Sequence, residues 1–259
     1  MALDKAAILQ TARCQLAADM NCDPEDFLRD GTVFREAVKG RGIWLDERQT
    51  PHLRAATMGK GIVVCADPEL LDKVRPILRG KERDDLFSAP FFYGQGIYYV
   101  PDSERMAELP CPDGFSLEKR EDGEVAALYA FPGFDHAIWY DARHPRPDAL
   151  VVYASCAGQI AGMAGASADC ESMWQIGIDV LPPFRGMGLA SCLVSRLAAL
   201  IMKRGIVPFY CTGSSNIPSQ LVAYRSGFAP AWMCSYRHVL DGMSPFEDDV
   251  FVGFRKSMD

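Results

Sequence analysis

Residues 176–191 decide the fold, and they read Ile-Gly-Ile-Asp-Val-Leu-Pro-Pro-Phe-Arg-Gly-Met-Gly-Leu-Ala-Ser. The apolar run at the start predicts a strand over residues 173–180. After two glycines the apolar residues change to helical spacing, with leucine or isoleucine at positions 189, 193, 197, 200 and 201. Gly205 follows a basic turn and is a typical helix stop. We therefore expect a strand, a glycine-bearing loop and a helix from about residue 188 to 204.

Small residues surround the start of this helix, at positions 186, 188, 190 and 191. Main-chain N–H groups there are unobstructed by side chains, and the positive end of a helix dipole attracts an anion. Arg185 adds a positive charge directly before the first glycine. The loop is therefore predicted to bind a phosphate or a diphosphate.

Two common phosphate-binding motifs do not fit this loop. A P-loop needs the pattern GxxxxGK followed by Ser or Thr, which is absent. A dinucleotide-binding fingerprint needs a third glycine where this chain has Ser191, and no acidic residue near Cys211 is placed to bind a ribose. A glycine-rich turn with only a structural role is the remaining alternative to an anion site.

The residues Arg185-Gly186-Met187-Gly188-Leu189-Ala190 resemble the Q/R-x-x-G-x-G/A loop of the GNAT superfamily of N-acetyltransferases. That family's second motif is similar to Asn216-Ile217-Pro218-Ser219 followed by Gly227-Phe228. The expected order of strands and helices resembles the family fold over roughly residues 113–240. The resemblance implies an enzyme that transfers an acetyl or other acyl group from acetyl-CoA to a primary amine by direct attack in a ternary complex.

The resemblance also implies roles for individual residues. The main-chain amide of Ile178 would face the thioester carbonyl, in the gap where the strand 173–180 parts from the strand 207–211. Acetyl-CoA, the co-substrate, would be bound by residues from three segments, namely Val180, Arg185, Gly186, Met187, Gly188, Leu189, Ala190, Ser191, Asn216 and Ser219.

The family's acid and base positions are not conventional in this chain. Ala223 stands where many members have a tyrosine acid, and Trp174 stands where some have a glutamate base. Tyr224 is the candidate acid and Glu171 the candidate base. Other groups remain open as alternatives, namely Asp169, Asp179, His136, His238 and, for a covalent route, Cys211 and Cys234. The alternative function is that of a non-catalytic acyl-CoA-binding regulatory protein, which would need neither a catalytic acid nor a base.

The fold class is predicted to be α/β (α+β), with a mixed, mostly antiparallel sheet flanked by helices. A polar stretch containing several prolines, residues 101–114, predicts a domain boundary. Residues 111–259 would be the acyltransferase domain. Residues 1–110 would be a smaller α/β unit that either covers the substrate cleft or is a degenerate copy of the acetyltransferase fold.

Composition excludes several classes of protein. The chain has 259 residues, 49% of them hydrophobic, which excludes disorder, and a formal net charge of −7, which argues against nucleic acid as a partner. An amine, either a small molecule or a peptide, suits the negative charge. Nine cysteines without a paired pattern indicate neither disulfides nor a metal site.

The cellular location is predicted to be the cytoplasm. The first 15 residues lack the apolar core of a signal peptide. Residues 149–168 carry no charge, but their glycines and polar residues predict a β-hairpin in place of a membrane helix. The sequence leaves the oligomeric state open.

Overall fold

The computed structural model describes residues 3–38 and 51–240. By compactness the chain divides into unit 1, comprising Met1–Gln15 and Gly96–Trp232, and unit 2, comprising Leu16–Gln95 and Met233–Asp259. The division falls inside helix α1 (Lys5–Asp19) and inside strands β4 (Phe92–Pro101) and β10 (Phe228–His238). The boundary between residues 110 and 111 stays a prediction, because compactness does not test which segments fold as separate domains.

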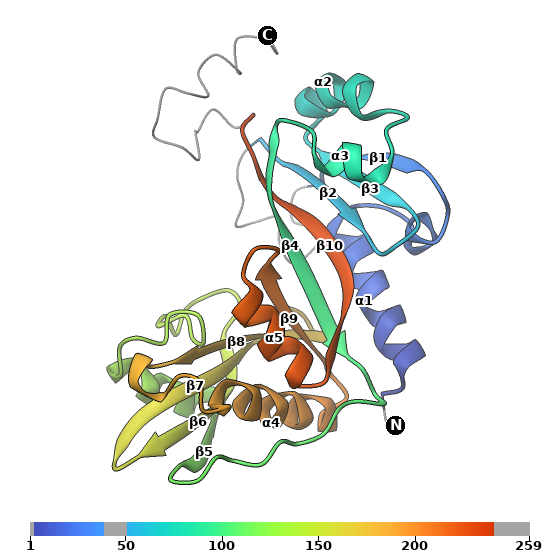
Figure 1. Cartoon of the computed structure of the whole chain (residues 1–259). Helices are drawn as coiled ribbons and strands as arrows, with labels where there is room; N and C mark the ends of the chain where they lie inside the picture. The colour runs from blue at the N-terminus through green and yellow to red at the C-terminus, as the bar shows by residue number, and fades with distance from the viewer. Residues whose placement is uncertain (1–2, 39–50, 241–259) are drawn as a thin grey trace. The chain divides into compact units, whose positions relative to one another are not determined.

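The sheet of unit 1 is mixed and mostly antiparallel, as the sequence predicted, and is labelled in Figure 1. Its strands lie in the order β4-β9-β8-β7-β6-β5. Neighbouring strands are antiparallel except β8 and β9, which are parallel. The bounds are β5 Ser116–Glu121, β6 Asp148–Cys156, β7 Gln159–Ser167, β8 Met173–Val180 and β9 Val207–Gly213.

The uncharged stretch 149–168 forms the hairpin of β6 and β7, as predicted. Ala157 and Gly158 make its turn with φ of 49° and 80°, the left-handed pair that a tight hairpin needs. Both strands are almost fully buried, which explains why the usual alternation of polar residues is missing. No helix within residues 3–38 and 51–240 is long and apolar enough to cross a membrane.

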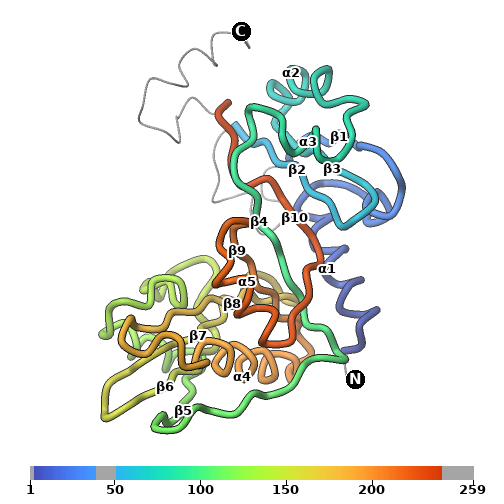
Figure 2. Tube along the Cα trace, viewed as in Figure 1, coloured from blue at the N-terminus to red at the C-terminus, as the bar shows by residue number. Residues whose placement is uncertain are grey.

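Two helices, α4 (Leu189–Lys203) and α5 (Ile217–Arg225), pack with β6, β7, β8 and β9 in one hydrophobic core. Their buried residues include Leu193, Leu197 and Ala223. A second core lies around η2 (Asp122–Ala130) and the loop that follows it, with Phe134, Ile138 and Met163 among its members. The chain path of these elements is traced in Figure 2. η2 is a 3₁₀ helix, and residues 131–140 that follow it are irregular chain.

Unit 2 contains a small sheet in which β3 (Ile62–Ala66) pairs with β1 (Thr32–Glu36) in parallel and with β2 (Leu53–Thr57) in antiparallel fashion. Met233 and Cys234 of β10 pair with β2 on its other side. Its core also contains apolar residues of α2 (Pro68–Leu78) and α3 (Arg83–Phe87). A short 3₁₀ helix, η1 (Pro24–Phe27), is capped by Asp23, whose side chain accepts the Glu25 N–H at 2.9 Å.

A buried ion pair fixes the start of β8. Arg146 Nη1 lies 2.7 Å from Asp169 Oδ1, and the two side chains are 7% and 0% exposed. Asp169 also accepts hydrogen bonds from the Gln175 N–H and the Ser167 hydroxyl. Burial raises the pKa of Asp169, and the Arg146 guanidinium opposes that rise. Asp169, one of the alternative bases, is therefore occupied in a structural role.

Replacing Asp169 with alanine is expected to lower the free energy of unfolding by about 3 kcal/mol, because it leaves the Arg146 charge buried without its partner. Urea unfolding followed by circular dichroism measures this. The matched control is Glu108→Ala, which removes a partly exposed carboxylate from Arg196 and Lys203 and is expected to cost about 1 kcal/mol or less. Equal decreases in the free energy of unfolding in both variants would show that the buried ion pair stabilises the protein no more than the exposed one does.

Candidate functional site

The turn between β8 and α4 is open to solvent. It runs from η3 (Pro182–Phe184) to Gly188, which is the N-cap residue of α4. Gly186 and Gly188 have φ of 81° and 82°, and a Cβ atom built on either would meet no other atom within 4 Å. Met187 between them is 55% exposed. The glycines therefore provide an unusual backbone path and leave free space above it.

The main-chain N–H groups of this turn are available to a ligand. Within the described residues, the N–H groups of the six consecutive positions from Gly186 to Ser191 donate to no main-chain carbonyl. The first N–H of this helix that donates to a main-chain carbonyl is that of Cys192, which bonds to the Gly188 carbonyl at 3.2 Å. Six free donors at the positive end of a 15-residue helix are suited to an anion with several oxygens.

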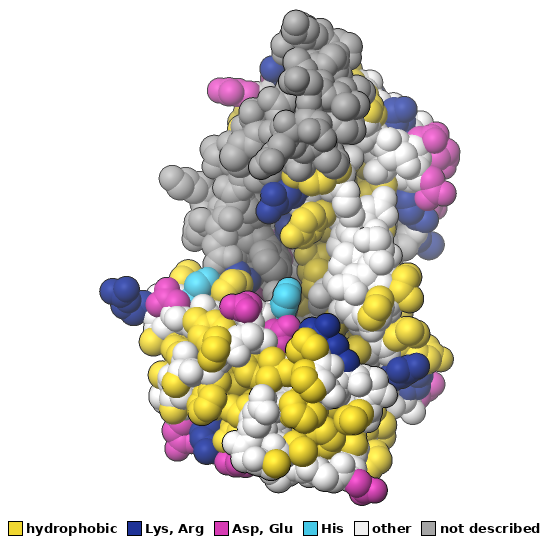
Figure 3. Space-filling model, turned by 60° about the vertical axis from the view of Figure 1, so that its left-hand side comes forward, with side chains coloured by type: hydrophobic (Ala, Val, Ile, Leu, Met, Phe, Trp, Pro, Cys, Tyr) yellow, Lys and Arg dark blue, Asp and Glu magenta, His cyan; other side chains and the backbone are white. Residues whose placement is uncertain are grey.

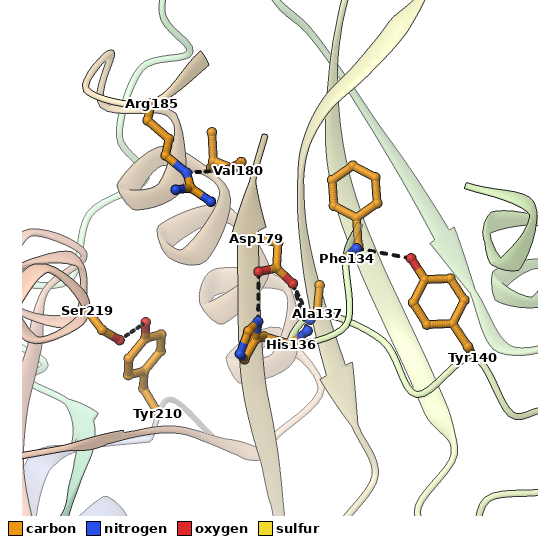
Figure 4. Close-up of polar contacts among 9 residues, drawn as sticks. All are labelled: Phe134, His136, Ala137, Tyr140, Asp179, Val180, Arg185, Tyr210 and Ser219. Atoms are coloured by element: carbon orange, nitrogen blue, oxygen red, sulfur yellow. Dashed lines mark hydrogen bonds and ion pairs between the residues drawn. The ribbon is translucent and has the colours of Figure 1, made fainter. Parts of the chain in front are cut away.

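Arg185 stands at the edge of this turn. Its Nε donates to the Val180 carbonyl at 2.8 Å, as Figure 4 shows. This hydrogen bond holds the guanidinium near the last residue of β8, and the side chain remains exposed. A positive charge is thereby placed between the end of the strand and the free N–H groups.

Strands β8 and β9 part halfway along their length. Their parallel pairing runs from Met173 with Val207 to Ile176 with Tyr210 and ends there. Both strands continue, β8 to Val180 and β9 to Gly213, each still paired on its outer side. Residues 177–180 of β8 and 211–213 of β9 are therefore not paired with each other, and we call this unpaired stretch the opening. The gap inferred from the family resemblance lies at this position.

The opening is lined by main-chain groups of Ile178 and Val180. The Leu181 N–H donates to the Ala161 carbonyl of the β7 side at 2.9 Å. Because main-chain groups of a strand alternate in direction, those of Asp179 also point toward β7, and those of Ile178 and Val180 point the opposite way. β9 has already separated at this level, so these groups have no partner strand, and only the Val180 carbonyl has a partner, the Arg185 Nε–H. A ligand in the opening can pair with them.

A histidine and an aspartate meet beside the opening. Asp179 Oδ1 lies 2.9 Å from His136 Nδ1, and Oδ2 accepts the main-chain N–H groups of His136 at 2.7 Å and Ala137 at 3.2 Å. Figure 4 shows both residues over β8. From sequence, His136 and Asp179 are two separate candidate bases, because no spacing signal joins residues 43 positions apart.

The loop that carries His136 lies directly on the sheet because two paired glycines make room for it. Gly165 of β7 pairs with Gly177 of β8. A Cβ atom on Gly177 would lie 1.7 Å from the His136 carbonyl oxygen, and one on Gly165 would lie 1.9 Å from that of Ala137. Any larger residue at either position would push the loop away.

The start of α5 faces the end of β9. Asn216 caps this helix by accepting the Ser219 N–H at 3.2 Å. The Ser219 hydroxyl lies 2.7 Å from the hydroxyl of Tyr210, the last residue of β9 that pairs with β8. Burial raises the pKa of Tyr210, and the hydrogen bond with Ser219 lowers it in part. Tyr210 is therefore a neutral phenol at the inner end of the opening, a position that the sequence analysis did not identify.

The candidate acid and base from the sequence are not brought to the opening. Tyr224 is 59% exposed, and its ring stacks under the Arg105 guanidinium at 4.0 Å. Ala223 beside it is the residue that faces the core. Glu171 is exposed and lies in the bend before β8, at the end where β8 is still paired with β9, whereas Ile178 lies near the other end of the strand. The structure therefore places Glu171 in the exposed bend before β8 and Tyr224 on the surface of α5, and their roles as base and acid stay predictions.

The remaining alternative histidine has a structural role. His238 is 1% exposed, and its Nε2 lies 3.0 Å from the Pro51 carbonyl. No group of three or more His, Cys, Asp or Glu side chains among residues 3–38 and 51–240 is arranged to hold a metal ion.

The comparison with protein families matches residues 104–228 to the Acetyltransferase (GNAT) family. This segment contains the opening, the glycine turn, His136 and Asp179. No curated protein matches the chain.

Several solved structures are similar to the chain. An acetyltransferase of the GNAT family from Colwellia psychrerythraea is 15% identical over 57% of this chain and 57% of its own, with a TM-score of 0.42. A GCN5-related N-acetyltransferase-like protein from Streptococcus suis is 16% identical over 69% and 72%, with a TM-score of 0.43. A GCN5-related N-acetyltransferase from Kribbella flavida is 14% identical over 62% and 66%, with a TM-score of 0.44. The chain spans less than two thirds of the Colwellia and Kribbella proteins.

Proposed function

Residues 104–228 of this chain belong to the GNAT acetyltransferase family, and from this premise we propose that the protein transfers the acetyl group of acetyl-CoA to a primary amine. The amine attacks the thioester directly while both substrates are bound. A small molecule or a peptide would supply the amine, and the net charge of −7 favours a cationic acceptor. The proposed compartment is the cytoplasm, where its nine cysteines would stay reduced as thiols.

The diphosphate of acetyl-CoA would be bound by the turn before α4. The free N–H groups from Gly186 to Ser191 would donate to its oxygens, and Arg185 would contribute a positive charge. The exposed residues at the start of α5, with Asn216 and Ser219, would contact the arm of the cofactor. Val180 would pair with an amide of the pantetheine through its main chain.

The thioester would then lie in the opening between β8 and β9. The Ile178 N–H points into this opening and would donate to the carbonyl oxygen, which becomes negative when the amine attacks. One such donor is typically worth about 100-fold in rate. This amide is in place before the substrate binds, because the pairing of β7 and β8 holds the strand.

The main support for the proposal is that two features lie close together in the chain. The sheet opens at Gly177–Val180, and the free N–H groups begin six residues after Val180, at Gly186. An anion site and an unpaired strand edge so close together match the two ends of one extended ligand, a diphosphate and an acyl thioester. A turn with only a structural role would need neither the free donors nor the opening.

Two measurements test the proposal. Acetyl-CoA at 100 times its Kd is expected to stabilise the protein by about 2.7 kcal/mol, which thermal unfolding detects. A panel of primary amines, with thiol release as the readout, is expected to include at least one that is acetylated. Absence of protection at millimolar acetyl-CoA would contradict the co-substrate assignment. Protection without turnover on any amine would instead support a non-catalytic acyl-CoA-binding protein.

A further inference from the structure

We infer that His136, oriented by Asp179, is the general base that accepts the proton of the attacking amine, an inference that rests on the proposed function. Of the polar side chains at the opening, the His136 imidazole combines a fixed orientation with free access from solvent. The side chain is 83% exposed, whereas that of Asp179 is 18% exposed. Figure 3 shows histidine, acidic and basic side chains exposed on the same face of the molecule.

The hydrogen bonds determine which ring nitrogen is basic. A carboxylate is only an acceptor, so the contact between Asp179 Oδ1 and His136 Nδ1 requires the proton on Nδ1. In the neutral ring Nε2 is then unprotonated and can accept a proton. Asp179 also holds the main chain of His136 and Ala137 through Oδ2. One carboxylate thus fixes both the position of the loop and the tautomer of the ring.

The imidazole lies on the correct side of the sheet. Ile178 and Val180 direct their side chains into the core that contains α4 and α5. Asp179 lies between them in the strand, so its side chain projects from the opposite face. His136 lies on this face, with its carbonyl above Gly177. The co-substrate would approach from the α4 end and the amine from the His136 face, so both would meet at the Ile178 amide.

A single base is sufficient for all the protons that the amine must lose. An alkylammonium ion must lose two protons to become an amide nitrogen. Nε2 of His136 accepts them one at a time and passes each to water. The lone pair of the neutral amine forms the C–N bond, the C–S bond breaks, and the sulfur leaves as the CoA thiolate, which takes a proton from water.

The test compares His136→Gln with the wild-type enzyme on an amine that the wild type acetylates. The kcat is expected to fall about 100-fold, the lower end of the range for loss of a general base, while the KM for acetyl-CoA stays within about twofold. In His136→Ala, free imidazole is expected to restore part of the kcat. A His136→Gln variant with more than about a third of the wild-type kcat would overturn the inference.

Asp179 is a positioning residue, and its test has a matched control. Asp179→Asn is expected to lower kcat about 10-fold or more with acetyl-CoA affinity unchanged, because the amide no longer selects the Nδ1–H tautomer. Asp135→Asn removes a neighbouring exposed carboxylate that is not bonded to the ring and is expected to keep wild-type kcat. Equal kcat in both variants would contradict the role of Asp179.

The two proposals can fail separately. If the wild-type protein binds no acetyl-CoA or acetylates no amine, the proposed function fails. If the wild type is active and His136→Gln is equally active, only the role of His136 fails. Because the His136 side chain is exposed, its replacement is expected to leave the unfolding temperature unchanged. Thermal unfolding of each variant checks that a fall in kcat does not come from loss of folded protein.

Discussion

Replacement of Gly188 by valine is expected to weaken acetyl-CoA binding by about 1,000-fold. A β-branched residue rarely adopts the φ of 82° found at this position. The turn would have to change its path, and the N–H groups that follow it would no longer converge on one anion. Loss of two hydrogen bonds to a charged group costs about 3–6 kcal/mol, and about 4 kcal/mol corresponds to 1,000-fold. Isothermal titration calorimetry with acetyl-CoA measures the change.

The same helix provides the control for this substitution. Gly205 follows the other end of α4, has φ of 77°, and also has no atom within 4 Å of a built Cβ. Gly205→Val introduces comparable backbone strain beyond the far end of α4, a helix about 22 Å long. Its acetyl-CoA affinity is expected to match the wild type. If Gly188→Val and Gly205→Val bind equally well, the turn is not the anion site.

Replacement of Gly177 by valine is expected to lower kcat by about 1,000-fold. The new side chain would require the space of the His136 carbonyl, which lies 1.7 Å from the position of a Cβ atom. The loop would move away from Asp179, and the strand that carries the Ile178 amide would be distorted. Loss of the base and loss of the oxyanion donor are each worth about 100-fold or more. Steady-state kinetics at saturating acetyl-CoA measures the fall.

Stability must be followed in parallel for this variant. Overpacking of this kind is expected to cost about 1–3 kcal/mol, so the protein should still fold. Gly123→Val serves as a control, because a Cβ atom there would meet no other atom within 4 Å. Its kcat is expected to be close to the wild-type value. A Gly177→Val enzyme that folds and retains the wild-type kcat would show that catalysis does not depend on the close packing of the His136 loop against Gly177.

The central part of the fold could be predicted from sequence because its signals are local. The strand over 173–180, the two glycines and the leucines of α4 lie within about 30 consecutive residues, so periodicity and turn chemistry suffice. The hairpin of β6 and β7 was predicted for the same reason, from the Ala157-Gly158 turn between two apolar runs.

Other features depend on contacts between distant residues. His136 and Asp179 meet only because a loop lies on Gly165 and Gly177, and neither glycine is marked as special in the sequence. Strand β4, residues 92–101, was not predicted, because Gly94 and Gly96 interrupt its apolar pattern. Glu171 is near Ile178 in sequence but lies at the closed end of the strand, since an extended chain separates residues rapidly.

The central claim is that acetyl-CoA binds along the free N–H groups from Gly186 to Ser191 and enters the opening at Ile178 and Val180. A titration of the ¹⁵N-labelled protein with coenzyme A, followed by amide NMR, tests it directly. We expect the largest chemical-shift changes at these eight amides, and smaller changes at Gly205 and at the rest of the sheet. Saturable binding with no change at Gly186–Ser191 or Ile178, or no binding at millimolar coenzyme A, would contradict the claim.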